Sequence, residues 1–216
     1  MTDEHGIFIS FEGTEGSGKT TQIRRLAQRL DAKNYQMLVT REPGGTQIGE
    51  AIREIIKDPI KSQNMYPETE LLLFAASRAQ LVREVIVPAL KEKYFVLCDR
   101  FLDSTTIYQG VARDIGTERV AMINDFAVNG VLPDLTIVLD VPAEIGFDRI
   151  KSRNEGPPDR MEMEPLEFYK NVRKGFLNLA QSLPDRFFVV DGIQNADTIE
   201  EIIWNEINKR FDRYPD

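Results

Sequence analysis

The residues best suited to chemistry lie near the amino end of the chain, where residues 13–20 read GTEGSGKT. Glycines at this spacing, followed by Lys and Thr, form loops whose backbone N–H groups surround the phosphates of a nucleoside triphosphate. In such a loop Lys19 contacts the β- and γ-phosphates, and the Thr20 hydroxyl ligates Mg²⁺. We therefore predict that ATP or GTP binds to Gly13, Thr14, Glu15, Gly16, Ser17, Gly18, Lys19 and Thr20.

A second candidate metal ligand is Asp99, which ends the apolar run YFVLCD at 94–99. In proteins with this type of loop, an acid at the end of a second strand holds the Mg²⁺, usually through water. Thr20 and Asp99 are therefore the predicted metal ligands, with Mg²⁺ as the cofactor. Motors, GTPases and small-molecule kinases share these features, so the two signals indicate an ATP- or GTP-binding protein and leave its activity open.

The elements that must position these residues follow from five short apolar runs. The runs lie near residues 6–11, 36–40, 94–99, 135–140 and 187–191. Their continuous apolar character is typical of strands covered on both faces, and the segments between them have helical spacing. This alternation predicts an α/β fold with a parallel sheet and helices on both sides, in a single domain of 216 residues. The polar stretches that end the runs then converge on one face, where such sheets bind their ligands.

Composition narrows the classes of function. Cys98 is the only cysteine and His5 the only histidine, so an internal disulfide, a zinc site of paired thiolates and a histidine-rich metal site are not expected. With 27 Lys+Arg against 35 Asp+Glu, the net charge is −8, which argues against a nucleic-acid polymer as partner. No signal-type segment begins the chain, and no apolar run approaches the ~20 residues that span a bilayer. We expect a cytoplasmic protein without a membrane partner.

Five segments together carry a resemblance to a known family. They are FEGTEGSGKTTQ at 11–22, TREPGGT at 40–46, LLLFAASRAQLV at 71–82, DRFLDSTTIYQG at 99–110 and PDLTIVLDV at 133–141. In this order they resemble the thymidylate kinases, which transfer the γ-phosphoryl group of ATP to dTMP and so form dTDP and ADP for dTTP synthesis. The resemblance implies a three-layer phosphate-loop NTPase fold with a five-stranded parallel sheet, and a homodimer.

The resemblance also assigns the residues that would bind the base of dTMP. Phe74 and Arg78 lie four apart in a predicted helix and therefore share one face. In the family the aromatic ring stacks on thymine and the arginine donates to thymine O4, a contact that disfavours cytosine because its amino group there is itself a donor. By the same correspondence Thr105 contacts the thymine ring, Tyr108 occupies the space of a ribose 2′-hydroxyl, and Gln109 lies near the base. Without the resemblance, Phe74 would be interpreted as a core residue and Arg78 as part of a solvated face.

The remaining acceptor residues belong to the phosphate and sugar end of dTMP. Arg100 follows Asp99 at the end of a predicted strand, where a guanidinium can clamp the phosphate of the acceptor. The family uses the turn that contains Glu42 and Pro43 to wall the dTMP site near its phosphate. It uses the acid at the position of Glu15 to accept a hydrogen bond from the deoxyribose 3′-hydroxyl, so the resemblance implies that this carboxylate faces the acceptor.

A cation must also neutralise the transferring phosphoryl group, because removing such an arginine costs roughly 10³ to 10⁵ in rate in other enzymes. Some thymidylate kinases carry this arginine in the phosphate loop directly after its acid, but here that position is Gly16. The resemblance to the bacterial type with a basic lid implies a mobile lid at about residues 149–163. We predict that Arg153 and Arg160 supply the charge and act as catalytic residues together with the loop lysine and Arg100.

Two other functions remain open on the sequence. The first is a kinase of another nucleotide or of a deoxynucleoside, which the Phe74/Arg78 pair and residues 104–110 disfavour. The second is a nucleotide-dependent switch. It is much less expected, because GTPases of this kind usually carry an NKxD motif, whereas NKRFD near the carboxyl end has a different spacing.

Overall fold

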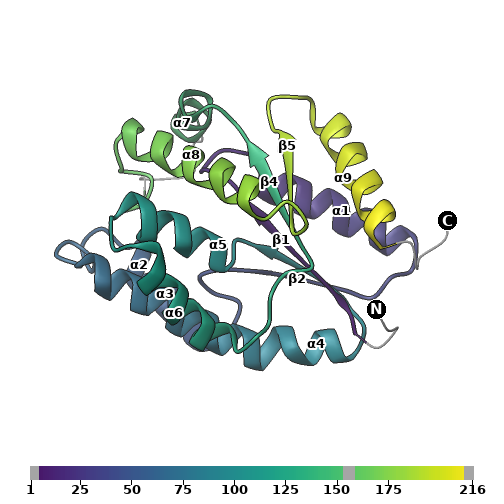
Figure 1. Cartoon of the computed structure of the whole chain (residues 1–216), viewed down its shortest axis with the longest axis horizontal. Coiled ribbons are helices and arrows are strands. Elements are labelled where there is room, and N and C mark those ends of the chain that lie inside the picture. The colour runs from purple at the N-terminus through teal and green to yellow at the C-terminus, as the bar shows by residue number, and fades with distance from the viewer. Residues whose placement is uncertain (1–4, 153–158, 212–216) are drawn as a thin grey trace.

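The computed structural model describes residues 5–152 and 159–211. Within these ranges, five parallel strands form one sheet in the order β2-β3-β1-β4-β5 (Figure 1). The strands are β1 (Ile7–Glu12), β2 (Met37–Arg41), β3 (Phe95–Asp99), β4 (Leu135–Asp140) and β5 (Phe187–Asp191). The predicted α/β class, with its five-stranded parallel sheet, is therefore confirmed.

Helices connect the strands and cover both faces of the sheet (Figure 1). They are α1 (Lys19–Ala32) after β1; α2 (Gln47–Lys57), α3 (Pro67–Leu81) and α4 (Val87–Lys91) after β2; α5 (Leu102–Thr105) and α6 (Thr117–Val128) after β3; α7 (Ala143–Lys151) and α8 (Leu166–Ser182) after β4; and α9 (Ala196–Arg210) after β5. Two π-helical turns, η1 (Val82–Ile86) and η2 (Thr106–Ala112), continue α3 and α5. Within the described ranges, none of these helices combines the length and the apolar character needed to cross a membrane.

Side chains of the central strand β1 alternate between two cores. Ile7, Ile9 and Phe11 pack with residues of α1 and α9, whereas Phe8 packs on the opposite face with residues of α3 and η1. Successive side chains of a strand point to opposite faces, so a strand that is apolar on both faces needs helices on both sides. Burying each of these side chains contributes about 1.5–3 kcal/mol. The sheet is thus fixed from both sides behind the loops that follow it.

The two edge strands differ from the prediction that the strands are covered on both faces. The prediction is correct for β1, β3 and β4, whose residues are almost all buried. It is wrong for β2 and β5, where Val39 is 51% exposed and Val189 is 41% exposed. Each of these strands has a neighbour on one side only, and their apolar composition carries no information about that position in the sheet.

The strand register brings the predicted site residues to one edge of the sheet. Phe11 of β1 pairs with Asp99 of β3, and Asp99 pairs with Arg41 of β2. Because these strands are parallel, their carboxyl ends lie side by side. The loop of residues 13–20 and the turns that follow β2 and β3 therefore meet there.

Candidate active site

A cavity of about 240 Å³ lies between these loops. It is lined by parts of the loop after β1, the turn after β2, helices α2 and α3, the turn after β3 and residues 159, 161 and 162. The cavity brings together these predicted site residues: Glu15, Gly16, Gly18, Lys19, Thr20, Glu42, Pro43, Phe74, Arg78, Asp99, Arg100, Thr105, Tyr108 and Gln109. Gly13, Thr14 and Ser17 belong to the same phosphate loop without lining the cavity.

The phosphate loop, residues 13–20, folds around the amine of Lys19. Lys19 Nζ donates to the Gly13 carbonyl at 3.2 Å and to the Thr14 carbonyl at 2.9 Å. Gly18, with a φ of 97°, precedes α1, so the positive amino end of that helix lies at the cavity. Burial lowers the pKa of Lys19 to about 8, and Arg100 adds to the effect. The amine is still protonated at neutral pH and supplies positive charge for phosphate oxygens.

Thr20 and Asp99 meet at the wall of the cavity. Thr20 Oγ1 donates to Asp99 Oδ2 at 2.8 Å. Both are oxygen ligands of the kind that Mg²⁺ prefers, and both line the cavity beside Lys19. The described part of the chain contains no group of three or more His, Cys, Asp or Glu side chains that could hold a metal by themselves. Mg²⁺ usually combines one or two protein ligands with water and substrate phosphates, and Thr20 and Asp99 are two oxygen ligands of this kind.

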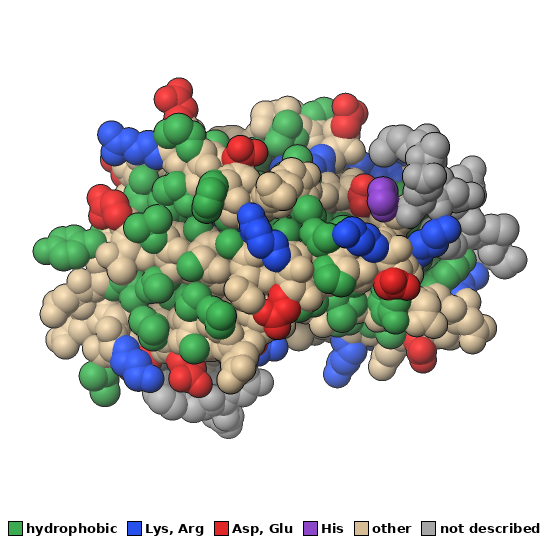
Figure 2. Space-filling view, turned by 90° about the horizontal axis from the view of Figure 1, so that it is seen from below, with side chains coloured by type: hydrophobic (Ala, Val, Ile, Leu, Met, Phe, Trp, Pro, Cys, Tyr) green, Lys and Arg blue, Asp and Glu red, His purple; other side chains and the backbone are tan. Residues whose placement is uncertain are grey.

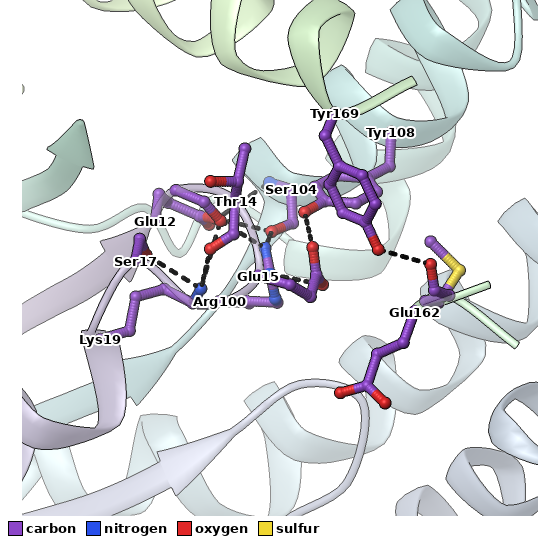
Figure 3. A network of polar contacts seen from close by, with 12 residues as sticks. Glu12, Thr14, Glu15, Ser17, Lys19, Arg100, Ser104, Tyr108, Glu162 and Tyr169 are labelled. Atoms are coloured by element: carbon purple, nitrogen blue, oxygen red, sulfur yellow. Dashed lines mark hydrogen bonds and ion pairs between the residues drawn. The ribbon is translucent and has the colours of Figure 1, made fainter. Parts of the chain in front are cut away.

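Glu15 connects the phosphate loop to the turn after β3 and to η2 (Figure 3). Its Oε1 accepts from Arg100 Nη2 at 2.7 Å, and its Oε2 accepts from the Tyr108 hydroxyl at 2.6 Å. Arg100 Nη1 also donates to the Gly13 carbonyl at 3.0 Å. Burial raises the pKa of the Tyr108 hydroxyl well above its ordinary value, so this hydroxyl is a donor at neutral pH. The side chain of Glu15 therefore lies on the side of the loop that faces Arg100 and Tyr108.

Arg78 is buried in the cavity wall and is held by several protein groups. Its side chain is 1% exposed. Nε donates to Glu42 Oε2 at 2.8 Å, Nη1 to Asn124 Oδ1 at 2.7 Å and Nη2 to Thr105 Oγ1 at 2.7 Å. Phe74, one turn earlier on α3, is partly buried and lines the same cavity. The alternative of a solvated Arg78 is therefore wrong, and its guanidinium is fixed in one orientation.

Glu42 is the buried counter-ion of Arg78. Burial raises the pKa of Glu42 to about 7, although Arg78 acts in the opposite direction. Among the described residues, Glu42 Oε1 is a buried atom without a hydrogen-bond partner. The next residue, Pro43, accepts at its carbonyl from Arg53 Nη1 at 2.9 Å. The turn after β2 is thus attached to α3 through Arg78 and to α2 through Arg53.

Arg160 does not line the cavity and does not reach the phosphate loop in this structure. Its Nη2 pairs with Glu70, and its Nε donates to the Ile56 carbonyl at 3.1 Å. Glu70 is buried and also accepts from Gln109 Nε2 at 2.5 Å. A buried carboxylate needs a cation, and Arg160 meets that need together with Arg113, whose Nε lies 3.4 Å from Glu70 Oε1. In this structure Arg160 is therefore bound to α3 and α2, and its role as a catalytic cation stays a prediction. Arg153 lies outside the described residues.

A different arginine of the predicted lid contacts the phosphate loop. Arg149, on α7, donates from Nη1 to the Gly16 carbonyl at 3.1 Å. The close approach depends on Gly16, whose φ is 73° and where an added Cβ would lie 2.4 Å from the Gly146 carbonyl oxygen. The basic pattern of residues 149–160 indicates several arginines equally well. Only the packing of α7 against the loop distinguishes Arg149.

Other residues at the cavity were not predicted from the sequence. Arg53 and Lys57 on α2, and Glu162, line it, while Asn124 on α6 holds Arg78 from behind. Arg53 and Lys57 lie four apart in the helix after REPGGT, and this spacing is a signal that could have found them. Asn124 carries no such signal, because it lies 46 positions from Arg78 in the chain.

Known proteins match this chain over most of its length. The thymidylate kinase family model matches residues 11–203. The thymidylate kinase of Kosmotoga olearia is 48% identical over 200 residues, which are 93% of this chain and 94% of that protein. The thymidylate kinase of Geobacter sulfurreducens is 47% identical over 213 residues, which are 95% of this chain and 100% of that protein.

A solved structure supports the fold as well. The crystal structure of thymidylate kinase from Ehrlichia chaffeensis matches with a TM-score of 0.75 and 33% sequence identity, and the match covers 94% of this chain and 98% of that one. The phosphate-loop NTPase fold expected from the motifs is therefore confirmed. On its sequence and on its structure, the chain belongs to the thymidylate kinase family.

Proposed function

We propose that this protein transfers the γ-phosphoryl group of ATP to dTMP and so forms dTDP and ADP for dTTP synthesis. As a member of the thymidylate kinase family it uses ATP as the phosphoryl donor. The observation that carries the proposal is the position of Glu15, which binds Arg100 and Tyr108 while Lys19 of the same loop is placed for ATP phosphates. One loop therefore borders a donor site and an acceptor site.

On the donor side, residues 13–20 bind the ATP phosphates in this proposal. Their backbone N–H groups and Lys19 supply the positive charge. Thr20 and Asp99 would hold Mg²⁺, which when bound neutralises charge on the β- and γ-phosphates. The protein then has to align the acceptor oxygen with the γ-phosphorus, and no covalent enzyme intermediate is needed.

On the acceptor side, thymine stacks on Phe74 and accepts a hydrogen bond at O4 from Arg78. The contacts of Arg78 with Glu42, Asn124 and Thr105 support this role, because they keep its guanidinium in place as a donor. Cytosine carries an amino group at the same position, and two donors facing each other are unfavourable. The base site therefore favours thymine.

The sugar and phosphate of dTMP lie nearer the phosphate loop. Tyr108 excludes a 2′-hydroxyl, Gln109 borders the base, and Glu15 accepts from the 3′-hydroxyl. Each oxygen of a carboxylate can accept more than one hydrogen bond. Glu15 can therefore accept from the 3′-hydroxyl in addition to Arg100 and Tyr108. Arg100 and Arg53, both cations of the cavity wall, suit the phosphate dianion.

We propose Arg149 as the first cation to stabilise the transferring phosphoryl group. It already contacts the phosphate loop, whereas Arg160 would have to leave Glu70 before it could act. Arg153 remains a prediction outside the described residues. A mobile lid at residues 149–163, within a single domain, also remains a prediction.

A coupled assay of ADP release over the common nucleoside monophosphates tests this function. We expect the highest kcat/KM with dTMP and very little ATP hydrolysis without an acceptor, since closure around both substrates excludes water. A higher kcat/KM for UMP or a deoxynucleoside than for dTMP would replace the proposal with the alternative kinase. Hydrolysis of ATP at a rate that dTMP does not change would favour a nucleotide-dependent switch.

We also propose a homodimer formed through helices away from the cavity. Met122 and Phe126 on α6 are 68% and 82% exposed, and Leu72 on α3 is 57% exposed. Figure 2 shows apolar side chains gathered over the helices that lie at the bottom of Figure 1. An exposed apolar surface of this kind suits a second copy of itself. Sedimentation analysis should show a dimeric wild type and a monomeric Phe126→Arg variant, and a monomeric wild type would contradict the proposal.

We further propose that the protein acts on free nucleotides in the cytoplasm, without a nucleic-acid or membrane partner. Its net charge of −8 opposes attraction to polyanions, and Lys19, Arg53 and Arg100 line a cavity sized for small molecules. Filter binding at low salt should retain neither DNA nor RNA. Retention at physiological salt would contradict the proposal.

A further inference from the structure

Glu12 is a buried carboxylate beside the site that has no role in the reaction as proposed so far. It is the last residue of β1, directly before the phosphate loop, and it is fully buried. Its Oε1 accepts from the backbone N–H groups of Phe101 at 2.8 Å and Ser104 at 3.3 Å, and its Oε2 accepts from the Ser104 hydroxyl at 2.6 Å. One carboxylate therefore holds the turn after β3 and the short helix α5 through three hydrogen bonds.

Ser104 extends this restraint to Arg100 (Figure 3). The Ser104 hydroxyl donates to Glu12 and accepts from Arg100 Nη1 at 3.0 Å. The same Nη1 donates to the Gly13 carbonyl at 3.0 Å, and Nη2 donates to Glu15 at 2.7 Å. The guanidinium is thereby fixed at the cavity wall by a chain of contacts that starts at Glu12.

The backbone of this turn also needs support. Arg100 has a φ of 69°, in the left-handed region that is unfavourable for a residue with a side chain. Its N–H donates to the Phe11 carbonyl at 2.9 Å, and the N–H of Phe101 donates to Glu12. Consecutive residues are thus tied to the end of β1 and keep the turn in this conformation.

The chemistry of Glu12 suggests a function rather than a contribution to stability. The three groups that bind it are uncharged, so its burial is not offset by a direct ion pair. Burial, together with the charge of Asp103, raises the pKa of Glu12 to about 7, while Arg100 acts in the opposite direction. Perturbed carboxyl groups beside a cavity are candidates for a functional role.

We infer that Glu12 is a positioning residue that holds Arg100, through Ser104 and the turn after β3, where the phosphate of dTMP binds. The inference rests on the proposed function, in which Arg100 contacts that phosphate. Glu12 does not line the cavity, so it acts on the substrate only through its neighbours.

Titration calorimetry with dTMP in the absence of ATP, followed by the coupled assay, tests the inference. Glu12→Gln keeps the size of the side chain but directs an amide N–H at the Ser104 oxygen, so the Ser104 hydroxyl loses its acceptor. We expect the Kd and KM for dTMP to rise about tenfold and the KM for ATP to change by less than about twofold. Ser104→Ala should give the same effect on dTMP, and the double variant should add little because both changes break one chain of contacts.

Asp103→Asn is the matched control. Asp103 lies on α5 beside Ser104, is buried and does not line the cavity. Its carboxylate accepts from Arg186 Nη1 at 2.6 Å. We expect this variant to melt at a lower temperature while its Kd for dTMP stays within about twofold of the wild type, because its partner lies away from Arg100. An equal loss of dTMP and ATP affinity in Glu12→Gln, or an equal loss of dTMP affinity in Asp103→Asn, would overturn the inference.

The same measurements separate the inference from the proposed function. If the wild type phosphorylates another monophosphate in preference to dTMP, the proposed substrate is wrong, and the variants are compared on that monophosphate by the same criteria. If the wild type prefers dTMP and Glu12→Gln binds it unchanged, the substrate is right and the inference fails.

Discussion

The cavity wall proposed to bind the acceptor and the helix α7 of the proposed lid hold their arginines in different ways. On the acceptor side, Arg78 is fully buried and is bound at 2.7–2.8 Å by groups that include Glu42 and Asn124. On the lid side, Arg149 is partly exposed and reaches the loop through the Gly16 carbonyl at 3.1 Å. The group proposed to read the base is therefore preorganised, whereas the cation proposed for transfer is on a side chain with more freedom to move.

The largest expected effect comes from removing Arg149, the cation proposed to stabilise the transferring phosphoryl group. Arg149→Ala should lower kcat by roughly 10³ and leave the KM for dTMP within a few-fold, because the acceptor side does not depend on it. Steady-state kinetics give both values, with Lys151→Ala on the same helix as the control. Arg160→Ala should mainly raise the KM for dTMP, since Arg160 binds Glu70, which binds Gln109. A larger fall in kcat for Arg160→Ala than for Arg149→Ala would reverse the assignment.

The next largest effect is expected from replacing Arg78, the buried arginine proposed to bind the base. Arg78→Gln should lower kcat/KM for dTMP by roughly 10², because a charge-assisted hydrogen bond is lost and Glu42 is left buried without its cation. It should also narrow the preference for dTMP over dCMP, since the glutamine carbonyl can accept from the cytosine amino group. The control is Arg83→Gln in η1, whose guanidinium binds the Ala79 and Ala127 carbonyls outside the cavity. An unchanged dTMP to dCMP ratio would argue against Arg78 as the base reader.

Glu15→Gln tests whether the carboxylate of the phosphate loop serves the proposed acceptor site rather than the ATP site. We expect the KM for dTMP to rise about tenfold and the KM for ATP to stay within about twofold, because this carboxylate faces Arg100 and Tyr108. Initial rates with each substrate varied in turn separate the two values. Glu84→Gln, which changes an exposed carboxylate that accepts from Gln80 Nε2 outside the cavity, serves as the control. Equal increases in both KM values would show that Glu15 supports the whole loop rather than the acceptor.

The smallest effect concerns stability and follows from the pKa of Glu12. Because burial raises this pKa from 4.5 to about 7, the folded state binds more protons than the unfolded state between these pH values. The contribution of Glu12 to the free energy of unfolding therefore falls as pH rises from 4.5 to 7 and is constant above that. The glutamine of Glu12→Gln does not titrate, so the variant keeps its stability over this pH range. The melting temperature of the variant minus that of the wild type should therefore increase by a few degrees as pH rises.

Melting curves of both proteins at intervals between about pH 5 and pH 8 measure this difference. Asp103→Asn, followed over the same range, should show a smaller fall in melting temperature than the wild type, because the charge of Asp103 contributes to the raised pKa of Glu12. A difference between wild type and Glu12→Gln that does not change with pH would show that Glu12 titrates at its ordinary pKa.

The sheet and the phosphate loop could be predicted because both depend on short stretches of sequence. The five apolar runs are the five strands of the described chain, and residues 13–20 close around Lys19 as the motif predicts. The exposure of β2 and β5 could not be predicted in the same way. It follows from the strand order, which depends on how the crossover helices pack.

The partners of the site residues were harder to predict than the residues themselves. The motifs point to Arg78, but Asn124 lies 46 positions away, and Ser104 is separated from Glu12 by 92 positions. Arg160 lies 90 positions from Glu70. A basic stretch does not show which buried carboxylate will be its neighbour, because that depends on tertiary packing.

The contact between Gly16 and Gly146 restricts how this enzyme can be redesigned. An arginine at position 16 would need a φ of 73°, and its Cβ would meet the Gly146 carbonyl oxygen at 2.4 Å. Helix α7 would have to move away from the phosphate loop, and Arg149, which lies on this helix, would move with it. On this backbone a loop arginine and a lid arginine therefore exclude each other. A variant that carries the arginine at position 16 instead of position 149 must therefore have the phosphate loop and α7 replaced together.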